Sequence, residues 1–171
     1  MNPTHWQTSD DGWRYYMCPL DIDPVVAGTF ASLVAIWQSK RQGDRLPAWR
    51  DFGLMDFKDW WGWLSVYDIV GRDPLDLWCR LWGGRLAMSH DQEFTHARLR
   101  DPASGMYGDS NMLDGVDVAF MEELIDGPLI GLSDGPMTWR QRDYERCESL
   151  RMPLADDGGT VDKLLCATRY L

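Results

Sequence analysis

The sequence lacks the features that assign a protein to a membrane, secreted or nucleic-acid-binding class. No apolar run is long enough to span a membrane, and the first residues lack the basic and apolar pattern of a signal peptide. Basic residues are in deficit, since 17 lysines and arginines stand against 27 acidic residues and give a formal net charge of −10. This charge disfavours nucleic acid and anionic membrane surfaces as partners. We therefore expect a cytoplasmic protein.

Cysteines are few and dispersed, and the common catalytic motifs are missing. The four cysteines stand at positions 18, 79, 147 and 166 and form no CxxC pair, which favours free thiols over a zinc site. There is no serine nucleophile elbow, no phosphate-binding P-loop and no dinucleotide-binding glycine pattern. These absences predict a protein that is not an enzyme, and they leave any cofactor unknown.

Tryptophan, in contrast, is abundant. The chain has ten tryptophans in 171 residues, a length that suits one domain with an extension. Because an indole is rarely left fully in water, this number predicts a large aromatic core, a sizeable interface, or both.

The clearest pattern is a β-hairpin across residues 61–86. Residues 70–74 (VGRDP) interrupt two apolar segments with turn-forming residues. The second segment alternates, so one set of side chains should face a core and the other set should face away. The first set is Leu77, Cys79 and Leu81, and the second set includes Trp78 and Trp82.

A helix is predicted over residues 24–42. Asp23 can cap it and Pro24 suits its first position. Apolar residues then recur at helical spacing: Val26, Phe30, Leu33, Val34 and Trp37. We expect this stripe to pack on the outer face of the sheet and to cover Trp78 and Trp82, either within one chain or from a twofold partner.

The remaining segments complete an α+β pattern. Residues 1–22 show no period and are interpreted as an irregular arm, so the chain divides into an arm and helix (1–43) and a main domain (44–171). Short helical turns, then a helix that ends at Gly127, separate the hairpin from the last strands. These strands are predicted at 129–133, 137–144, 147–154 and 160–170, with breaks at 134–136 and 155–159. Counted as three strands, these segments and the two strands of the hairpin give the expected fold: a five-stranded antiparallel sheet with helices on one face and an N-terminal helix.

Four segments make the chain resemble a PAS domain, and more narrowly the small, mostly single-domain bacterial PAS proteins with a helix before the core. The segments are 33–50 (LVAIWQSKRQGDRLPAWR), 79–86 (CRLWGGRL), 93–101 (EFTHARLRD) and 150–170 (LRMPLADDGGTVDKLLCATRY). In these proteins a glycine commonly follows the threonine of the third segment, whereas this chain has His96. The resemblance implies a sensory or regulatory module with a curved sheet, a pocket between sheet and helices, and dimers through the N-terminal helix.

Two functions follow from this resemblance. The first is a regulatory module in bacterial signal transduction that forms a homodimer and acts through contacts with another signalling protein. The alternative is a sensor that binds a small molecule or a cofactor such as haem, flavin or a metal. Its pocket would be lined by residues that would otherwise be simple core: Leu77, Cys79, Leu81, Phe94, Phe120 and Leu124.

Two polar groups are weaker candidates. His90 and His96 stand near Asp91 and Glu93 and could bind a metal or haem or belong to an enzyme site, but their spacing matches no metal motif and such a group is more often a solvated surface. Four arginines on the later strands could receive an acidic ligand or discourage edge-to-edge aggregation: Arg140, Arg142, Arg146 and Arg151.

Overall fold

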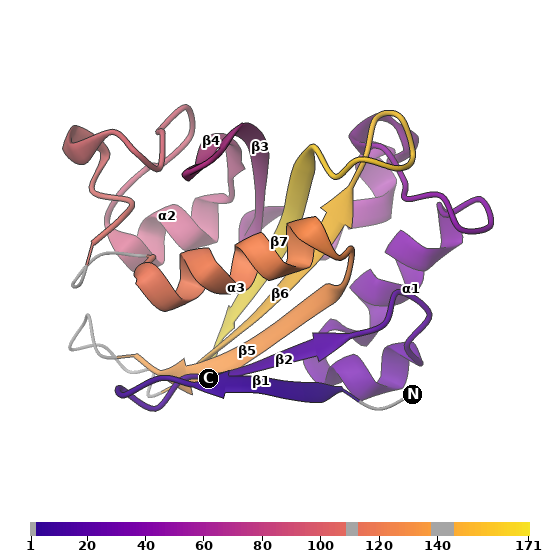
Figure 1. Cartoon of the computed structure of the whole chain (residues 1–171), viewed down its shortest axis with the longest axis horizontal. Coiled ribbons are helices and arrows are strands. Elements are labelled where there is room, and N and C mark those ends of the chain that lie inside the picture. Colours follow the sequence, from indigo (N-terminus) through magenta and orange to yellow (C-terminus); the bar gives the residue numbers. More distant parts are fainter. Residues whose placement is uncertain (1–2, 109–112, 138–145) are drawn as a thin grey trace.

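The structure is a computed structural model that describes residues 3–108, 113–137 and 146–171. Its centre is one antiparallel sheet of seven strands in the order β1-β2-β5-β6-β7-β3-β4 (Figure 1). The strands are β1 (Thr4–Thr8), β2 (Arg14–Cys18), β3 (Leu64–Arg72), β4 (Leu75–Trp82), β5 (Ile130–Pro136), β6 (Arg146–Leu154) and β7 (Lys163–Tyr170). The α-helices are α1 (Ala31–Ser39), α2 (Gly84–His90) and α3 (Gly115–Asp126), and a 3₁₀ segment η1 (Pro24–Phe30) precedes α1.

The α+β class is confirmed, but the sheet has seven strands rather than the predicted five. The difference comes from the N-terminal arm, which was predicted to be irregular and instead forms the hairpin β1–β2. β2 pairs with β5 from Arg14 opposite Asp134 to Cys18 opposite Ile130. Strands β1 and β2 of the predicted arm therefore lie in one sheet with the strands of the predicted main domain.

The predicted hairpin is present as β3 and β4, which pair from Ser65 opposite Trp82 to Arg72 opposite Leu75. A β-bulge shifts the register between Val66 and Tyr67, so that Arg80 has no direct partner on β3. An extra residue in one strand reverses the alternation beyond it. The bulge is the reason that the regular alternation predicted for this strand fails at its end.

Trp78 and Trp82 consequently do not form the shared outer patch that the alternation predicted. The Trp78 indole stacks on the imidazole of His96, with ring centroids 5.3 Å apart. Trp82 is buried against Phe94, and its Nε1 donates to the carbonyl oxygen of Gln92 at 3.2 Å. Both indoles are thus held by the segment that follows β4, and not by the N-terminal helix.

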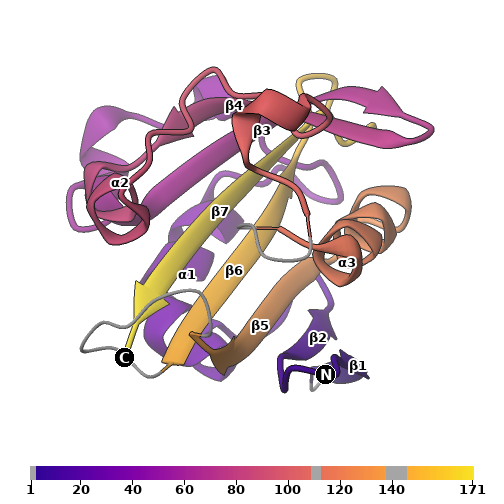
Figure 2. The same cartoon turned by 90° about the vertical axis from the view of Figure 1, so that its left-hand side faces the viewer.

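The N-terminal helix is shorter than predicted but lies on the expected side of the sheet. Figures 1 and 2 place α1 on one face of the sheet and α3 on the other. The Trp37 Nε1 donates to the carbonyl oxygen of Pro153 on β6 at 3.1 Å, which ties α1 to the sheet within one chain. The helix ends at Ser39 rather than near residue 42.

The sheet face opposite α1 packs closely against α3. This helix ends at Asp126, next to the Gly127 at which the predicted helix ends. Gly131 on β5 lies beneath this helix, where an added Cβ would stand 2.4 Å from Leu124 and 2.8 Å from Phe120. β5 runs through the predicted turn at 134–136, since Asp134 and Gly135 pair with Glu148 and Cys147. Of the strand predicted at 137–144, residues 138–144 lie outside the described part.

Candidate functional site

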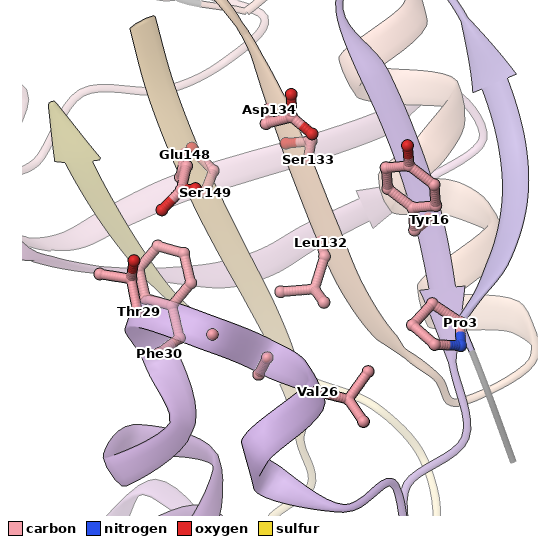
Figure 3. A pocket seen from close by; sticks show the side chains of 12 residues that line it. Pro3, Tyr16, Val26, Thr29, Phe30, Leu132, Ser133, Asp134, Glu148 and Ser149 are labelled. Atoms are coloured by element: carbon pink, nitrogen blue, oxygen red, sulfur yellow. The ribbon is translucent and has the colours of Figure 1, made fainter. Parts of the chain in front are cut away.

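A cavity of about 430 Å³ lies on the α1 side of the sheet, between η1 and strands β2, β5 and β6 (Figure 3). Its floor is formed by residues on the outer face of three neighbouring strands, among them Tyr16, Leu132 and Glu148. Val26 and Phe30 close it from η1. A volume of several hundred cubic ångströms and a largely apolar wall are typical of small-molecule sites.

The backbone of η1 shapes this cavity. The Asp23 carboxylate accepts from the Val25 amide at 3.0 Å, and Pro24 follows, as expected at a helix start. Gly28 then takes a φ of 56°, a left-handed conformation that breaks the helix before α1 begins. Because of this kink, η1 and α1 are two segments, and η1 borders the cavity while α1 covers the sheet.

Two carboxylates lie toward one end of the cavity, away from Pro3 and Val26 (Figure 3). Asp134 is neutralised by two guanidinium groups, since Arg14 donates to it at 3.1 and 2.5 Å and Arg146 also donates to it. Glu148 is the cross-strand partner of Asp134 and is half-buried. Within the described ranges, no side chain forms an ion pair or hydrogen bond with the Glu148 carboxylate.

Arg169, the neighbouring cation, contacts aromatic rings rather than Glu148. Arg169 is the cross-strand partner of Glu148 on β7, but its guanidinium lies 4.5 Å from the ring centroid of Trp60 and 4.7 Å from that of Trp63. Burial lowers the pKa of Arg169, and so does the positive charge of Arg85. Glu148 therefore has a negative charge that no directly bonded cation from the described part of the chain compensates.

The six residues predicted to line a ligand pocket do not line this cavity. Five are buried and Leu81 is half-buried: Leu77, Cys79, Leu81, Phe94, Phe120 and Leu124. Phe120 and Leu124 lie on α3, on the opposite side of the sheet from η1. Burial raises the pKa of the Cys79 thiol to about 12, so this thiol is neutral and a poor nucleophile at neutral pH.

Most of the predicted interface stripe is buried inside the chain. Phe30, Leu33, Val34 and Trp37 are each at most 2% exposed, whereas Val26 is 41% exposed at the edge of the cavity. The Phe30 ring lies 5.8 Å from the ring of Trp60, which shows one contact that covers the stripe. Packing within the chain therefore accounts for this stripe, and only its first residue is left for a partner.

The two candidate metal-binding histidines have different partners. His90 forms a hydrogen bond with the Tyr170 hydroxyl at 2.8 Å, whereas His96 stacks on Trp78. The Glu93 carboxylate accepts from the amide and hydroxyl of Thr95, at 2.8 and 2.5 Å. In the part of the chain that the structure describes, no three histidine, cysteine or acidic residues are grouped to hold a metal ion.

The predicted arginine group is divided between two environments. Arg146 pairs with Asp134 near the cavity, whereas Arg151 is buried beneath α3 and donates to Asp117 at 2.9 Å and to the Ser133 hydroxyl at 2.9 Å. Arg140 and Arg142 lie outside the described residues. Arg151 is thus part of the core and is not available to an acidic partner.

A second surface feature has no counterpart in the sequence predictions. Leu54 and Met55 begin the 3₁₀ segment η3 (Leu54–Phe57) and are 73% and 72% exposed. The Trp61 indole donates to the carbonyl oxygen of Leu54 at 2.9 Å, so the backbone that carries both side chains is fixed. Adjacent exposed apolar side chains on an ordered segment are typical of protein contact surfaces.

Comparison with protein-family models, with curated proteins and with solved structures finds no match to this chain. Among the described residues, no helix is both long enough and apolar enough to cross a membrane.

Proposed function

We propose that this chain is a PAS-type regulatory module of bacterial signal transduction that acts through contacts with another signalling protein. The observation that carries the proposal is the arrangement of β3 to β7. The hairpin β3–β4 and the strands β5, β6 and β7 form one continuous antiparallel sheet in the order β4-β3-β7-β6-β5. Helices α2 and α3 form a helical insert between β4 and β5 in the sequence. This is the succession of elements predicted from the sequence pattern, to which the chain adds β1 and β2 at the β5 edge, and it supports the proposal.

His96 gives this proposal local support. At the position where the resembling proteins commonly have glycine, His96 has a φ of 70°, a conformation that glycine adopts without strain. Its amide donates to the carbonyl oxygen of Cys79 at 2.7 Å, and this bond holds the segment after α2 against β4. The turn geometry that glycine would serve is therefore present with histidine in its place.

The contact surface that we propose contains Leu54 and Met55. Capture of partners from cells by the tagged protein should recover a signalling protein, and Leu54→Ser/Met55→Ser should reduce that recovery by at least about tenfold, since a few residues carry most of the energy of an interface. Lys58→Ser, at an exposed site on the same segment, is the matched control. Equal recovery with both variants would remove this surface from the proposal, and sedimentation of the same samples measures the homodimer that the resemblance implies.

A small-molecule sensor is the second candidate, and the cavity beside η1 favours it. The cavity has an apolar wall, a few polar groups and a volume suited to a metabolite of moderate size. Its place on the α1 side differs from the pocket expected between the sheet and the helical insert. A haem or flavin absorption band in the purified protein would favour a cofactor sensor over a contact module.

A further inference from the structure

We infer that the cavity beside η1 binds a small organic cation, a protonated primary amine that carries an aromatic or branched apolar group. This inference rests on the second candidate function and names the class of its ligand. The apolar group would occupy the space between Phe30, Leu132 and Tyr16, which come from η1, β5 and β2. The ammonium group would lie at the end of the cavity where Glu148 is placed (Figure 3).

The charges around the cavity determine the sign of the ligand. Asp134 already accepts hydrogen bonds from Arg14 and Arg146, so it has little remaining attraction for a further cation. Glu148 is half-buried and has no bonded partner among the described residues. A carboxylate that is partly removed from water loses hydration, and an ammonium donor would replace it with a charge-assisted hydrogen bond.

A neutral hydroxyl is available for one of the remaining ammonium protons, since Thr29 lines the cavity from η1. An ammonium group carries three donors and no acceptor, so it can bond to a carboxylate and to a hydroxyl oxygen at the same time. A carboxylate ligand would instead meet the uncompensated charge of Glu148, and the chain as a whole repels anions through its net charge of −10.

The test compares three probes that share one apolar group and differ in charge: 2-phenylethylamine, 2-phenylethanol and 3-phenylpropionate. Binding is measured at neutral pH by nuclear magnetic resonance titration of the full chain, with amide shifts used to locate the site. We expect a dissociation constant in the millimolar range for the amine, as suits so small a ligand. We expect binding of the alcohol to be about tenfold weaker and no measurable binding of the acid.

Two variants assign the charge preference to Glu148. Glu148→Gln keeps the shape of the side chain and should remove most of the tenfold preference for the amine while leaving the affinity for the alcohol unchanged. Glu123→Gln, at an exposed site on α3, is the control for the change in net charge and should bind all probes as the unaltered chain does. Spectra of both variants verify that the fold is retained.

The outcomes separate this inference from the function on which it rests. Equal binding of amine and alcohol at the cavity, or an amine preference that persists in Glu148→Gln, would overturn the inference and leave a sensor without charge selection. Shifts confined to another surface, or no shift with any probe, would overturn both the inference and the sensor function at this cavity. Neither result affects the proposed contact function.

Discussion

Arg151 on β6 donates a hydrogen bond to Asp117 on α3 at 2.9 Å, and both side chains are largely removed from solvent. The Tyr15 hydroxyl donates to the same Asp117 oxygen at 3.3 Å, and the Arg151 guanidinium lies 5.6 Å from the ring centroid of Phe120. A charged pair therefore connects the sheet to α3 within an aromatic environment. Since α3 is the helix that covers this face, the pair fixes where the helix sits on the strands.

We expect the loss of either partner of this pair to be severe. Arg151→Met or Asp117→Asn alone should lower the free energy of unfolding by about 3–5 kcal/mol, because each leaves a buried charge without its partner. The double variant should recover part of that loss. Arg50→Met is the control, since Arg50 and Asp156 are mostly exposed and 3.8 Å apart, and it should cost less than about 1 kcal/mol. Denaturant unfolding measures the stability of the two single variants, the double variant and the control. Similar losses for Arg151→Met and Arg50→Met would contradict the role of the Arg151–Asp117 pair in stability.

The packing of α3 on β5 leads to a second prediction. Gly131→Ala should destabilise the protein by about 1–3 kcal/mol, because the new Cβ would overlap the Leu124 and Phe120 side chains and force them to shift. Gly84→Ala is the matched control, since no atom lies within 4 Å of the Cβ that it would add. Thermal unfolding of the two variants makes the comparison. A Gly131→Ala protein as stable as Gly84→Ala would show that α3 packs less closely than described.

The third prediction concerns His96 and its positive φ. His96→Gly should change the free energy of unfolding by less than about 1 kcal/mol, because the relief of backbone strain offsets the loss of the ring stacked on Trp78. His96→Val should lower it by about 1–3 kcal/mol, since a β-branched residue is strained in this conformation. Denaturant unfolding distinguishes the two. If glycine proved as harmful as valine, stacking on Trp78 would outweigh the backbone requirement.

The four buried thiols predict how stability depends on alkaline pH. Burial raises the pKa from an ordinary value of 9.0 to about 11 for Cys18 and to about 12 for Cys79, Cys147 and Cys166. As the pH rises above 9, the unfolded chain therefore releases these protons first and is stabilised relative to the folded state. The free energy of unfolding should fall as the pH rises from about 8 to about 12, and less steeply in Cys166→Ala. Rapid alkylation of the folded protein at about pH 8 would contradict the raised pKa values.

Sequence reasoning predicted the elements whose pattern is local and missed those defined by distant pairing. The hairpin of β3 and β4, the Asp23 cap and helix α3 all have periodicity or turn residues within one short segment. β1 and β2 have no such pattern, because β2 forms a strand through pairing with β5, which is more than a hundred residues away in sequence. The break predicted at Asp134 fails for the same reason, since Arg14 and Arg146 hold this residue in the sheet.

The candidate site was not predictable from the sequence for a related reason. Its walls come from η1, β2, β5 and β6, and Gly28 alone indicates where η1 bends away from α1. The stripe from Val26 to Trp37 correctly predicted that a helix covers the sheet, but not that it would do so within one chain with only Val26 left exposed. The alternation of apolar and polar residues in β4 placed Trp78 and Trp82 on one face. The one-residue bulge at Arg80 changes this, and the alternation gives no clear sign of it.

Native mass spectrometry of the chain isolated gently from its own cells tests the proposed contact function most directly, with an absorption spectrum of the same sample. A PAS-type contact module predicts a complex that contains a second, signalling protein. It also predicts no haem or flavin band beyond the absorption of the aromatic residues. A chain that is always alone and carries the mass and visible spectrum of a tightly bound haem or flavin would contradict the account, and would establish a cofactor sensor in its place.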